Sequence, residues 1–549
     1  MENRRILLLA LIGVVLFTLY QNWQADYVKP PAAAAPTTQT APMPGAGATA
    51  AADNSAAATT AGAAPTQAKV RVQTDKLVVE IALAGGELSH LELSDYPVDK
   101  KHPQDKLALL DDTDGQRFVV QSGVSTAERV LAGPEQAFNA PQNEYRLADG
   151  ADTLEVPLEY QSADGYTVRK VYSFKRGSYE IGLTQTLINH SGQALNAGAY
   201  ARLLRNPPPP PAGPGIARTA GSFAGLGVYE QKTDGSGYRF KKVAFKDLEK
   251  NAYAAHQTGG WLAMLQHYFI VAIIAPDGAA DFSGNYNAAR LLYSGQYSGA
   301  LAPVAAGGEH SYALKFYVGP EAQGSLDAVA PGFELTEDYG LLTPIAKPLF
   351  WVLKAYNKLT GNWGWAIILL TCTVRLIFFP LSAAQYRSMA KMRKFGPRIA
   401  ELRERFADDR ERLNQAMMDL YKKEGFNPLA GCWPLLVQMP VFISLYWVLA
   451  QSVELRQAPF ILWMQDLSAA DPFYVMPVLY GASMWAQQKL SGQATTMDPQ
   501  QARIMNIMPI ALTGLFVFFP VGLVLYWFVS NMINIGQQQI ITRRLEKKG

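Results

Sequence analysis

The feature that most constrains this chain is a series of long apolar segments in its C-terminal part. We predict membrane spans within five ranges, 349–381, 429–454, 473–490, 505–519 and 521–541. A helix needs about 20 residues to cross the hydrocarbon layer of a bilayer, and these runs come close to that length. A sixth apolar run, Ile6–Tyr20, follows Arg4 and Arg5 near the N-terminus. The pattern predicts a polytopic α-helical membrane protein with six spans.

Composition indicates that a large polar part accompanies these spans. Charged residues make up 17% of the chain, against about 25% in soluble domains. The mean hydropathy of −0.02 is nevertheless too low for a chain buried in lipid throughout. A net charge of +3 does not suggest a nucleic-acid partner, and two cysteines, Cys372 and Cys432, cannot build a disulfide scaffold or a Cys-type zinc site. We expect no metal and no cofactor.

The N-terminal run admits two interpretations. Its length suits a cleavable secretory signal, but no small-residue cleavage site directly follows Tyr20, so we favour an uncleaved anchor over residues 1–24. Arg4 and Arg5 place its N-terminus in the cytoplasm. Residues 25–68 are almost entirely Ala, Pro, Thr, Gly and Gln, a composition that buries too little apolar area to fold, and we predict a disordered linker.

Residues 69–324 have the alternating pattern of β-strands. Between Val70 and Ile81 apolar residues recur at every second position, and Gly85-Gly86 predicts a turn. Similar short runs continue to about Val318 without a long helical pattern between them. We predict a β-sandwich here, followed over 325–348 by an amphipathic connector on the outer membrane surface.

The distribution of charge predicts the orientation of the spans. The loop at 382–428 holds eleven Lys or Arg against seven Asp or Glu, and the tail at 542–549 is also basic. Loops rich in Lys and Arg stay in the cytoplasm, so six spans leave both termini cytoplasmic and the β-sandwich on the periplasmic side of a bacterial inner membrane.

The 382–428 loop is itself patterned for helices. Apolar residues recur at helical spacing in two runs, on either side of Ala407-Asp408-Asp409. We predict an antiparallel helical hairpin that starts at Gly396-Pro397 and ends at Gly425. Its charged surface is either a solvated face or a docking site for a ribosome or targeting factor.

Arg375 is the single charged residue inside the apolar cores of these ranges, about 363–381, 429–449, 473–488, 505–519 and 521–541. Either its side chain snorkels to the inner headgroups, or it faces a wet interior, which we favour because other polar residues accompany it. Thr371 lies one helical turn before it. The polar residues of the other spans all fall in the cytoplasmic half, namely Gln438, Gln487, Asn506, Ser530, Asn531 and Asn534. Together they predict a water-filled groove that is open to the cytoplasm and closed toward the periplasm.

Residue types that the spans lack argue against several functions. They contain no central Asp, Glu or His for proton coupling, no Ser-His pair or paired Asp for hydrolysis, and no nucleotide-binding fingerprint. We therefore expect that the protein is not an enzyme. A transporter or channel, or an envelope enzyme acting on sugars through the β-sandwich, remain as alternatives.

Four motifs give a family resemblance. They are Gly260–Pro276, Asn427–Trp447, Val453–Leu479 and Gly522–Asn531. In these motifs, and over nearly the whole chain except the linker, the sequence resembles the YidC membrane protein insertases of Gram-negative bacteria.

That resemblance implies a β-supersandwich similar to sugar mutarotases, an insertase core of five spans with a hydrophilic groove, and Arg375 as the groove arginine. Residues that the family uses to contact the substrate helix correspond to Met439, Phe442, Tyr526 and Trp527. Trp527 stands where many relatives have a second tyrosine. The implied partners are nascent membrane proteins, the Sec translocon, a ribosome or targeting factor, and the lipid bilayer.

Overall fold

The computed structural model of the chain describes residues 68–546, except for 101, 114–115, 209–222, 233–234, 267, 323–324, 338, 395, 407–408, 424–432 and 492–498. The anchor predicted at 1–24, the linker at 25–68 apart from Ala68, the predicted hairpin end at Gly425 and the last residues of the basic tail lie outside the described residues.

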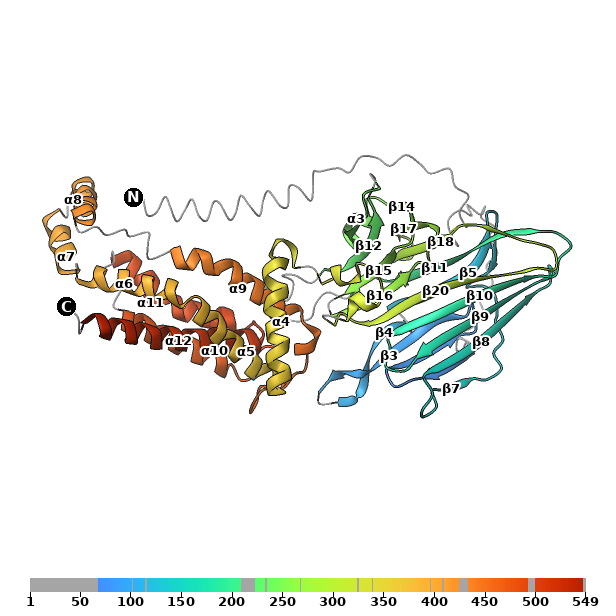
Figure 1. Ribbon diagram of the computed structural model, residues 1–549, viewed down its shortest axis with the longest axis horizontal. Coiled ribbons are helices and arrows are strands. Elements are labelled where there is room, and N and C mark those ends of the chain that lie inside the picture. Colours follow the sequence, from blue (N-terminus) through green and yellow to red (C-terminus); the bar gives the residue numbers. More distant parts are fainter. Residues whose placement is uncertain are drawn as a thin grey trace, which may run out of the picture. The chain divides into compact units, whose positions relative to one another are not determined.

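Residues 69–320 form a sandwich of two β-sheets (Figure 1). The larger sheet has the strand order β14 (Tyr253–Thr258), β17 (Ala279–Asn287), β18 (Leu292–Gly299), β11 (Leu195–Arg205), β5 (Gln116–Thr126), β4 (His102–Thr113), β3 (Glu87–Asp99), β2 (Leu77–Ala82), β1 (Lys69–Gln73), β7 (Glu144–Arg146), with β6 (Val130–Ala132) beside β5 and β19 (Ala302–Val304) beside β11. The smaller sheet has the order β13 (Tyr238–Ala244), β12 (Gly225–Gln231), β15 (Trp261–Gln266), β16 (Phe269–Ile274), β20 (Glu309–Pro320), β10 (Glu180–Asn189), β9 (Tyr166–Lys175), β8 (Thr153–Ser162).

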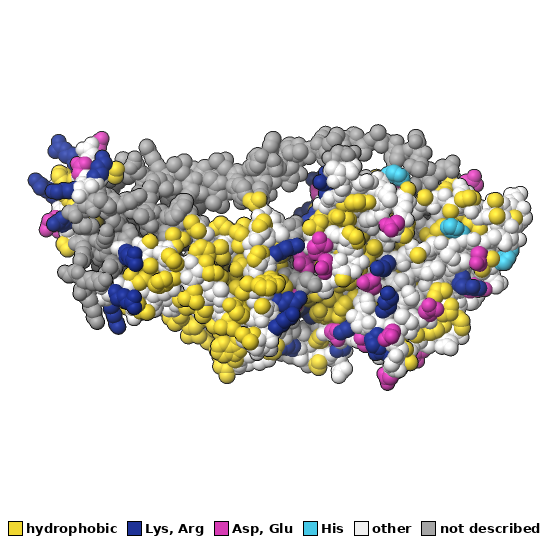
Figure 2. All heavy atoms as spheres, viewed as in Figure 1, with side chains coloured by type: hydrophobic (Ala, Val, Ile, Leu, Met, Phe, Trp, Pro, Cys, Tyr) yellow, Lys and Arg dark blue, Asp and Glu magenta, His cyan; other side chains and the backbone are white. Residues whose placement is uncertain are grey.

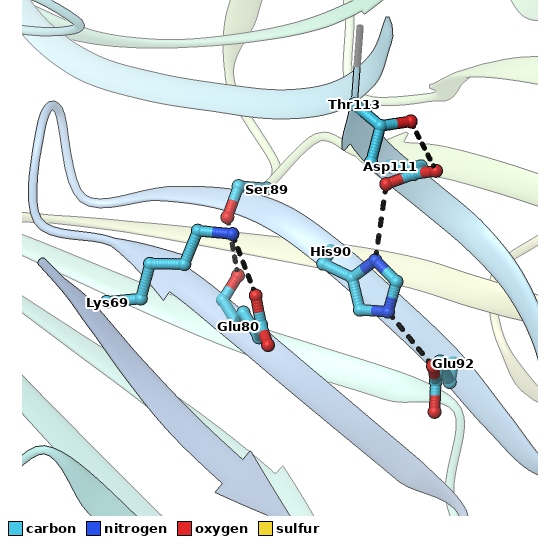
Figure 3. Close-up of polar contacts among 7 residues, drawn as sticks. All are labelled: Lys69, Glu80, Ser89, His90, Glu92, Asp111 and Thr113. Atoms are coloured by element: carbon cyan, nitrogen blue, oxygen red, sulfur yellow. Dashed lines mark hydrogen bonds and ion pairs between the residues drawn. The ribbon is translucent and has the colours of Figure 1, made fainter. Parts of the chain in front are cut away.

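The core of the sandwich lies between the sheets, and the other face of the larger sheet is polar. Leu91 and Phe282 from one sheet and Tyr172 and Phe316 from the other belong to one buried cluster. Because side chains alternate along a strand, their neighbours point outward. Figure 3 shows part of the outward face on β1 to β4. There Lys69 pairs with Glu80 at 2.9 Å, and His90 lies 3.1 Å from Glu92 and 3.4 Å from Asp111. Apolar and polar residues that alternate in the sequence therefore lie on the inner and outer faces of the larger sheet, respectively.

One cation is buried inside this core. The Lys170 ammonium group donates hydrogen bonds to the carbonyl of Gly85 at 2.7 Å, and to the carbonyl and hydroxyl oxygens of Ser122 at 2.8 and 3.1 Å. It also lies 4.8 Å from the centre of the Phe138 ring. Burial lowers the pKa of Lys170 to about 7, against a partly compensating attraction from Glu87.

The segment expected as a connector over 325–348 extends into a helix that continues past this range. It consists of short 3-10 turns and then α4 (Thr343–Thr360), which begins inside that range and runs past it. Ala346, Phe350 and Leu353 on α4 are buried and belong to the core of the helical part. The 3-10 turns are η1 (Leu326–Ala328), η2 (Phe333–Leu335) and η3 (Gly340–Leu342).

The segment expected as one span over 349–381 is broken. α4 ends at Gly361, whose backbone is left-handed with φ of 66°, and α5 (Trp363–Ile377) begins directly after Asn362. A left-handed glycine satisfies the last carbonyls of a helix, and the Asn362 side chain accepts hydrogen bonds from the first amides of the next one. Gly361 therefore ends one helix, Asn362 begins the next, and the segment forms two helices in place of one.

A second bend separates α5 from α6 (Phe379–Lys394). The two axes differ by 60° across Phe378. Pro380 is the second residue of α6, and proline both lacks an amide hydrogen and disfavours a helical conformation in the residue before it. Because α6 continues to Lys394, the beginning of the predicted 382–428 loop is helical.

The remaining helices are α7 (Gly396–Arg405), α8 (Arg410–Lys423), α9 (Trp433–Gln451), α10 (Val475–Ser491), α11 (Pro499–Phe516) and α12 (Val521–Glu546). The last four overlap the apolar segments expected at 429–454, 473–490, 505–519 and 521–541. α7 begins at Gly396, as the sequence predicts. The packing of α7 and α8 as an antiparallel hairpin stays a prediction.

Length and hydropathy alone do not mark any described helix, taken singly, as a membrane span. The bent pair Trp363–Ile377 with Phe379–Arg387 meets both criteria when taken together. Figure 2 shows apolar side chains covering most of the surface over the helices. Leu376 is 70% exposed and Ile510 is 74% exposed. Apolar surface of this extent requires an apolar environment outside the protein.

Candidate functional site: a polar cavity among six helices

A cavity of about 480 Å³ lies among α5, α6, α9, α10, α11 and α12. Nine of the residues singled out from the sequence line it. Those expected in the groove are Arg375, Gln438, Gln487, Ser530 and Asn534, and those expected to contact a substrate helix are Met439, Phe442, Tyr526 and Trp527. The structure thus brings together residues that are far apart in the chain.

Arg375 is held at the cavity wall by neutral side chains. Its exposed fraction is 9%, and its Nε donates to the Ser530 hydroxyl at 2.8 Å. Nη2 donates to the same hydroxyl, and Nη1 donates to the Gln438 side-chain oxygen at 3.4 Å. With the Gln438 amide turned over, its oxygen accepts from both terminal nitrogens at 3.2 Å. The guanidinium therefore bonds within the helices and does not extend into lipid.

No carboxylate neutralises this cation among the described residues of the cavity. The sequence of α5, α6, α9, α10 and α11 contains no Asp or Glu, and α12 has only its terminal Glu546. The cavity lining likewise contains no acidic side chain. Burying a charge without an opposite partner costs free energy. An anionic group inside the cavity would therefore be attracted to Arg375.

The cavity has an apolar end and a polar end along α12. Tyr526, Ser530, Asn534 and Gln538 recur at every fourth residue, which places them on one face of the helix. Tyr526 lies nearest the start of α12, the Ser530 hydroxyl follows about one turn later, and the amides of Asn534 and Gln538 follow about two to three turns later. Polarity thus increases along the helix, and the cavity presents an apolar and a polar environment to one ligand.

Aromatic rings form the apolar end. Phe442 stacks on Trp527 with ring centres 5.1 Å apart, and Phe516 lies 4.0 Å from Trp527 by the same measure. Tyr480 packs against Phe516 at 4.8 Å. These four rings come from α9, α12, α11 and α10, so four helices meet at Trp527 and close this end of the cavity with apolar surface.

Three residues expected in the groove lie outside its lining. Thr371 is fully buried, and its hydroxyl donates to the Ile367 carbonyl of its own helix at 2.6 Å. Asn531 donates to the Ser483 hydroxyl at 2.8 Å and so joins α12 to α10. Asn506 is exposed on α11. In each case the side chain points to a side of its helix that does not line the cavity.

Ten further lining residues were not identified from the sequence. They are Ser382, Gln385, Tyr386, Tyr480, Met484, Gln488, Met505, Met508, Phe516 and Gln538. Gln538 extends the four-residue spacing of α12 and was detectable by that signal. The α6 residues were missed because the charge of the following segment assigned them to a cytoplasmic loop.

Possible metal ligands among the described residues are not grouped into a site. No group of three or more His, Cys, Asp or Glu side chains in the described parts of the chain is placed to hold a metal ion. The cavity itself presents one guanidinium, hydroxyls, amides, thioethers and aromatic rings. Groups of these kinds are suited to binding a ligand by charge, hydrogen bonds and apolar contact.

The helical part has a wide apolar surface and a polar cavity with one cation, and it is joined to a β-sandwich. These features define a class of membrane protein with a large extramembrane domain. Comparison with known families agrees with this class. The family described as 60Kd inner membrane protein matches residues 355–548, and the YidC periplasmic domain matches residues 69–352.

Full-length relatives identify the family. The chain is 42% identical to the membrane protein insertase YidC of Nitrosococcus oceani, over 100% of both chains. It is 44% identical to that of Methylococcus capsulatus, over 100% of this chain and 99% of the relative. A crystal structure of an active YidC insertase with its first transmembrane domain resolved is 18% identical, covers 86% of this chain and 92% of its own, and has a TM-score of 0.39. The chain belongs to the YidC family of membrane protein insertases, transmembrane proteins of the bacterial inner membrane with a periplasmic domain.

Proposed function

We propose that the cavity accepts the polar tail or hairpin loop of a nascent inner-membrane protein and releases the adjoining apolar helix into lipid. The observation that carries this proposal is the buried Arg375, bonded to Ser530 and Gln438 and to no carboxylate, in a cavity of about 480 Å³. Polar groups held inside the membrane lower the cost of moving a polar segment through hydrocarbon.

Arg375 selects for the charge of the entering segment. An acidic side chain that reaches the guanidinium supplies the missing counter-charge, and the interaction is stronger here than in water because little solvent screens it. The polar stripe of Ser530, Asn534 and Gln538 leads toward Arg375. Acidic tails therefore gain more from this cavity than neutral tails of the same length.

The apolar part of the substrate follows the aromatic end. Phe442, Tyr526 and Trp527 offer a surface on which an apolar helix packs before it leaves for lipid, and Met439 adds a flexible thioether side chain. Transfer of about 20 apolar residues from water into the bilayer supplies the driving force, so no nucleotide is required.

The topology that goes with this mechanism has six spans, cytoplasmic termini and a cavity that opens to the cytoplasm. The basic 382–428 segment, with α7 and α8, is the proposed docking site for a ribosome or targeting factor. Insertion alone or in cooperation with the Sec translocon belongs to the same proposal. These points rest on the distribution of Lys and Arg and on the family.

Substitution of Arg375 tests the charge selection. We expect Arg375→Ala to reduce insertion of a substrate with an acidic tail by at least about tenfold, which corresponds to loss of about 1.4 kcal/mol. Arg375→Lys keeps the charge but not the paired hydrogen bonds, and is expected to retain part of the activity. A substrate with a neutral tail serves as the control. Unchanged insertion of the acidic-tail substrate by both variants would remove Arg375 from the mechanism.

Site-specific photo-crosslinking tests the path of the substrate. A photoreactive residue at Phe442 or Trp527 should crosslink to a stalled nascent chain, whereas one at Ile510, which is 74% exposed and outside the cavity, should not. Equal crosslinking from all three positions would mean that the nascent chain contacts the helices without selecting the cavity.

A further inference from the structure

A basic stripe runs along α4 (Thr343–Thr360), outside the cavity. Lys347, Trp351, Lys354 and Lys358 recur at spacings of four, three and four residues, which aligns them on one face of the helix. Lys347 and Lys358 are exposed, and Trp351 is 72% exposed. Lys347 and Lys358 are eleven residues apart, about 16 Å along a helix. The stripe is long enough to meet more than one lipid headgroup.

Lys347 and Lys358 carry the unpaired charge of α4 among the described residues. The helix itself contains three lysines and no Asp or Glu. Among the ion pairs between described residues, none involves Lys347 or Lys358. The buried face formed by Ala346, Phe350 and Leu353 fixes the helix against the core of the helical part, so the lysines are held on the outside.

The position of α4 relates this stripe to the membrane surface. The match to the YidC periplasmic domain ends at residue 352 and the match to the inner membrane protein begins at residue 355, so the boundary falls within α4. Figure 1 shows α4 running across the ends of the neighbouring helices. Figure 2 shows basic side chains over this region, at the edge of the apolar surface of the helices. In the topology proposed above, this edge of the helical part lies at headgroup level on the periplasmic side.

Two features point to lipid as the ligand. Lysines are normally depleted on the outer side of an inner membrane, so a cluster there needs a specific reason. Beside the lysines, Trp351 and Leu359 are 72% and 77% exposed. Exposed tryptophan and leucine beside lysines are typical of helices whose apolar residues enter the acyl region while the lysines meet anionic headgroups. An acidic protein would account for the lysines but not for the apolar residues.

We propose that α4 binds anionic phospholipid headgroups of the outer leaflet of the inner membrane through Lys347 and Lys358, with Trp351 inserted between them. The ligand class is a phosphodiester headgroup attached to acyl chains, such as phosphatidylglycerol. The binding positions α4, and through its packing α5, at a fixed depth in the membrane. It adds a lipid site to the family function and does not depend on the proposed role of Arg375.

The test uses the full chain in detergent, titrated with equal amounts of phosphatidylglycerol and phosphatidylcholine and examined by native mass spectrometry. Each lysine near an anionic surface contributes roughly a fivefold preference. We expect the double substitution Lys347→Gln, Lys358→Gln to lower the preference for phosphatidylglycerol at least about fivefold. The double substitution Lys246→Gln, Lys250→Gln on exposed residues of the β-sandwich removes the same charge and should leave the preference unchanged.

Two further measurements keep the proposal falsifiable if the glutamine variant is unstable. The variant Lys347→Arg, Lys358→Arg keeps the charge and should retain the preference, and the preference of the unaltered chain should fall when salt screens the lysines. Inorganic phosphate should not displace the lipid, because it lacks the acyl chains that Trp351 contacts. An unchanged lipid preference in the folded glutamine variant, or an equal loss in the matched control, overturns the proposal. Lost lipid preference with normal insertion would leave the cavity mechanism intact.

Discussion

At the scale of single residues, Ser530 determines how the Arg375 guanidinium is presented. The Ser530 hydroxyl accepts hydrogen bonds from two nitrogens of Arg375, while Gln438 contacts the remaining side. Without the hydroxyl, the guanidinium is free to turn away from the cavity. Ser530 is thus a positioning residue, which acts on the substrate through Arg375.

We predict that Ser530→Ala lowers insertion of an acidic-tail substrate several-fold, because a hydrogen bond to a charged group contributes about 1.5–3 kcal/mol. Ser530→Thr keeps the hydroxyl and should restore most of the activity. Insertion assays with acidic and neutral tails check this. Equal losses for both tails in the alanine variant would indicate a structural defect in place of a positioning role.

Lys170 is a second buried cation, in the β-sandwich, and it makes stability depend on pH. Its pKa is about 7 in the folded protein and 10.5 in the unfolded chain. Between these values the unfolded chain binds the proton and the folded chain does not, so the free energy of unfolding rises with pH. Below pH 7 the lysine is charged in both states and its full burial penalty opposes folding.

We predict that raising the pH from 8 to 9.5 stabilises the β-sandwich, by up to about 1.4 kcal/mol per pH unit from this residue. The three hydrogen bonds of the ammonium group favour its charged form and reduce that gain. Glu321, whose pKa burial raises to about 8, is half protonated in the folded protein at pH 8, so it opposes the gain at the lower edge of this window. Pulse proteolysis of the full chain in urea gives the midpoints, and Lys170→Met should flatten their pH dependence. Equal slopes in both proteins would contradict the prediction.

At the scale of elements, the start of α5 determines where Arg375 lies. The Asn362 side-chain oxygen accepts hydrogen bonds from the amides of Gly364 and Trp365, at 2.9 and 3.3 Å. Its amide nitrogen donates to the carbonyls of Pro459 and Phe460 in the α9–α10 connection. The residue therefore caps one helix and attaches it to a distant loop.

We predict that Asn362→Ala lowers the free energy of unfolding by about 1–2 kcal/mol, within the range measured for lost N-caps. Asn362→Asp keeps the cap but loses the two donated bonds, so it should be intermediate. Thermal unfolding of the purified full chain in detergent measures both. An alanine variant as stable as the unaltered chain would mean that packing alone fixes the start of α5.

At the scale of the whole molecule, the β-sandwich and the helical part make separate contributions. The two family matches divide the chain near residue 353, and the cavity lies entirely among helices on the C-terminal side. The sandwich has its own core between its two sheets. Its likeness to sugar mutarotases stays a prediction from the resemblance.

We predict that deletion of residues 69–318 leaves part of the insertion activity, because every residue lining the cavity is retained. Complementation of a depletion strain, with insertion of a short acidic-tail substrate as the second measure, checks this. Complete loss of insertion by a deletion variant that still reaches the membrane would assign the essential activity to the sandwich, as the sugar-enzyme alternative requires.

The sequence alone predicted the β-sandwich, the apolar helical segments that follow it and nine of the residues that line the cavity, from groups far apart in the chain. Alternation between Val70 and Ile81 predicted strands, and the runs now seen as α9 to α12 were recognised from apolar length. Both signals are local, because a strand or helix needs neighbours of the right polarity at fixed spacing. Motifs such as Gly522–Asn531 also indicated the family, which the full-length relatives confirm.

Only the tertiary structure decided how each helix is rotated about its axis, where helices bend, and which side chains contact one another. Ser530 and Asn531 are adjacent in sequence, yet one binds Arg375 and the other binds Ser483. The entry of α6 into the cavity wall was likewise not predicted, because the charge of the following residues assigned α6 to a loop. The physical reason is that depth follows from position along a helix, whereas the direction of a side chain depends on how each helix turns and bends to bury its neighbours.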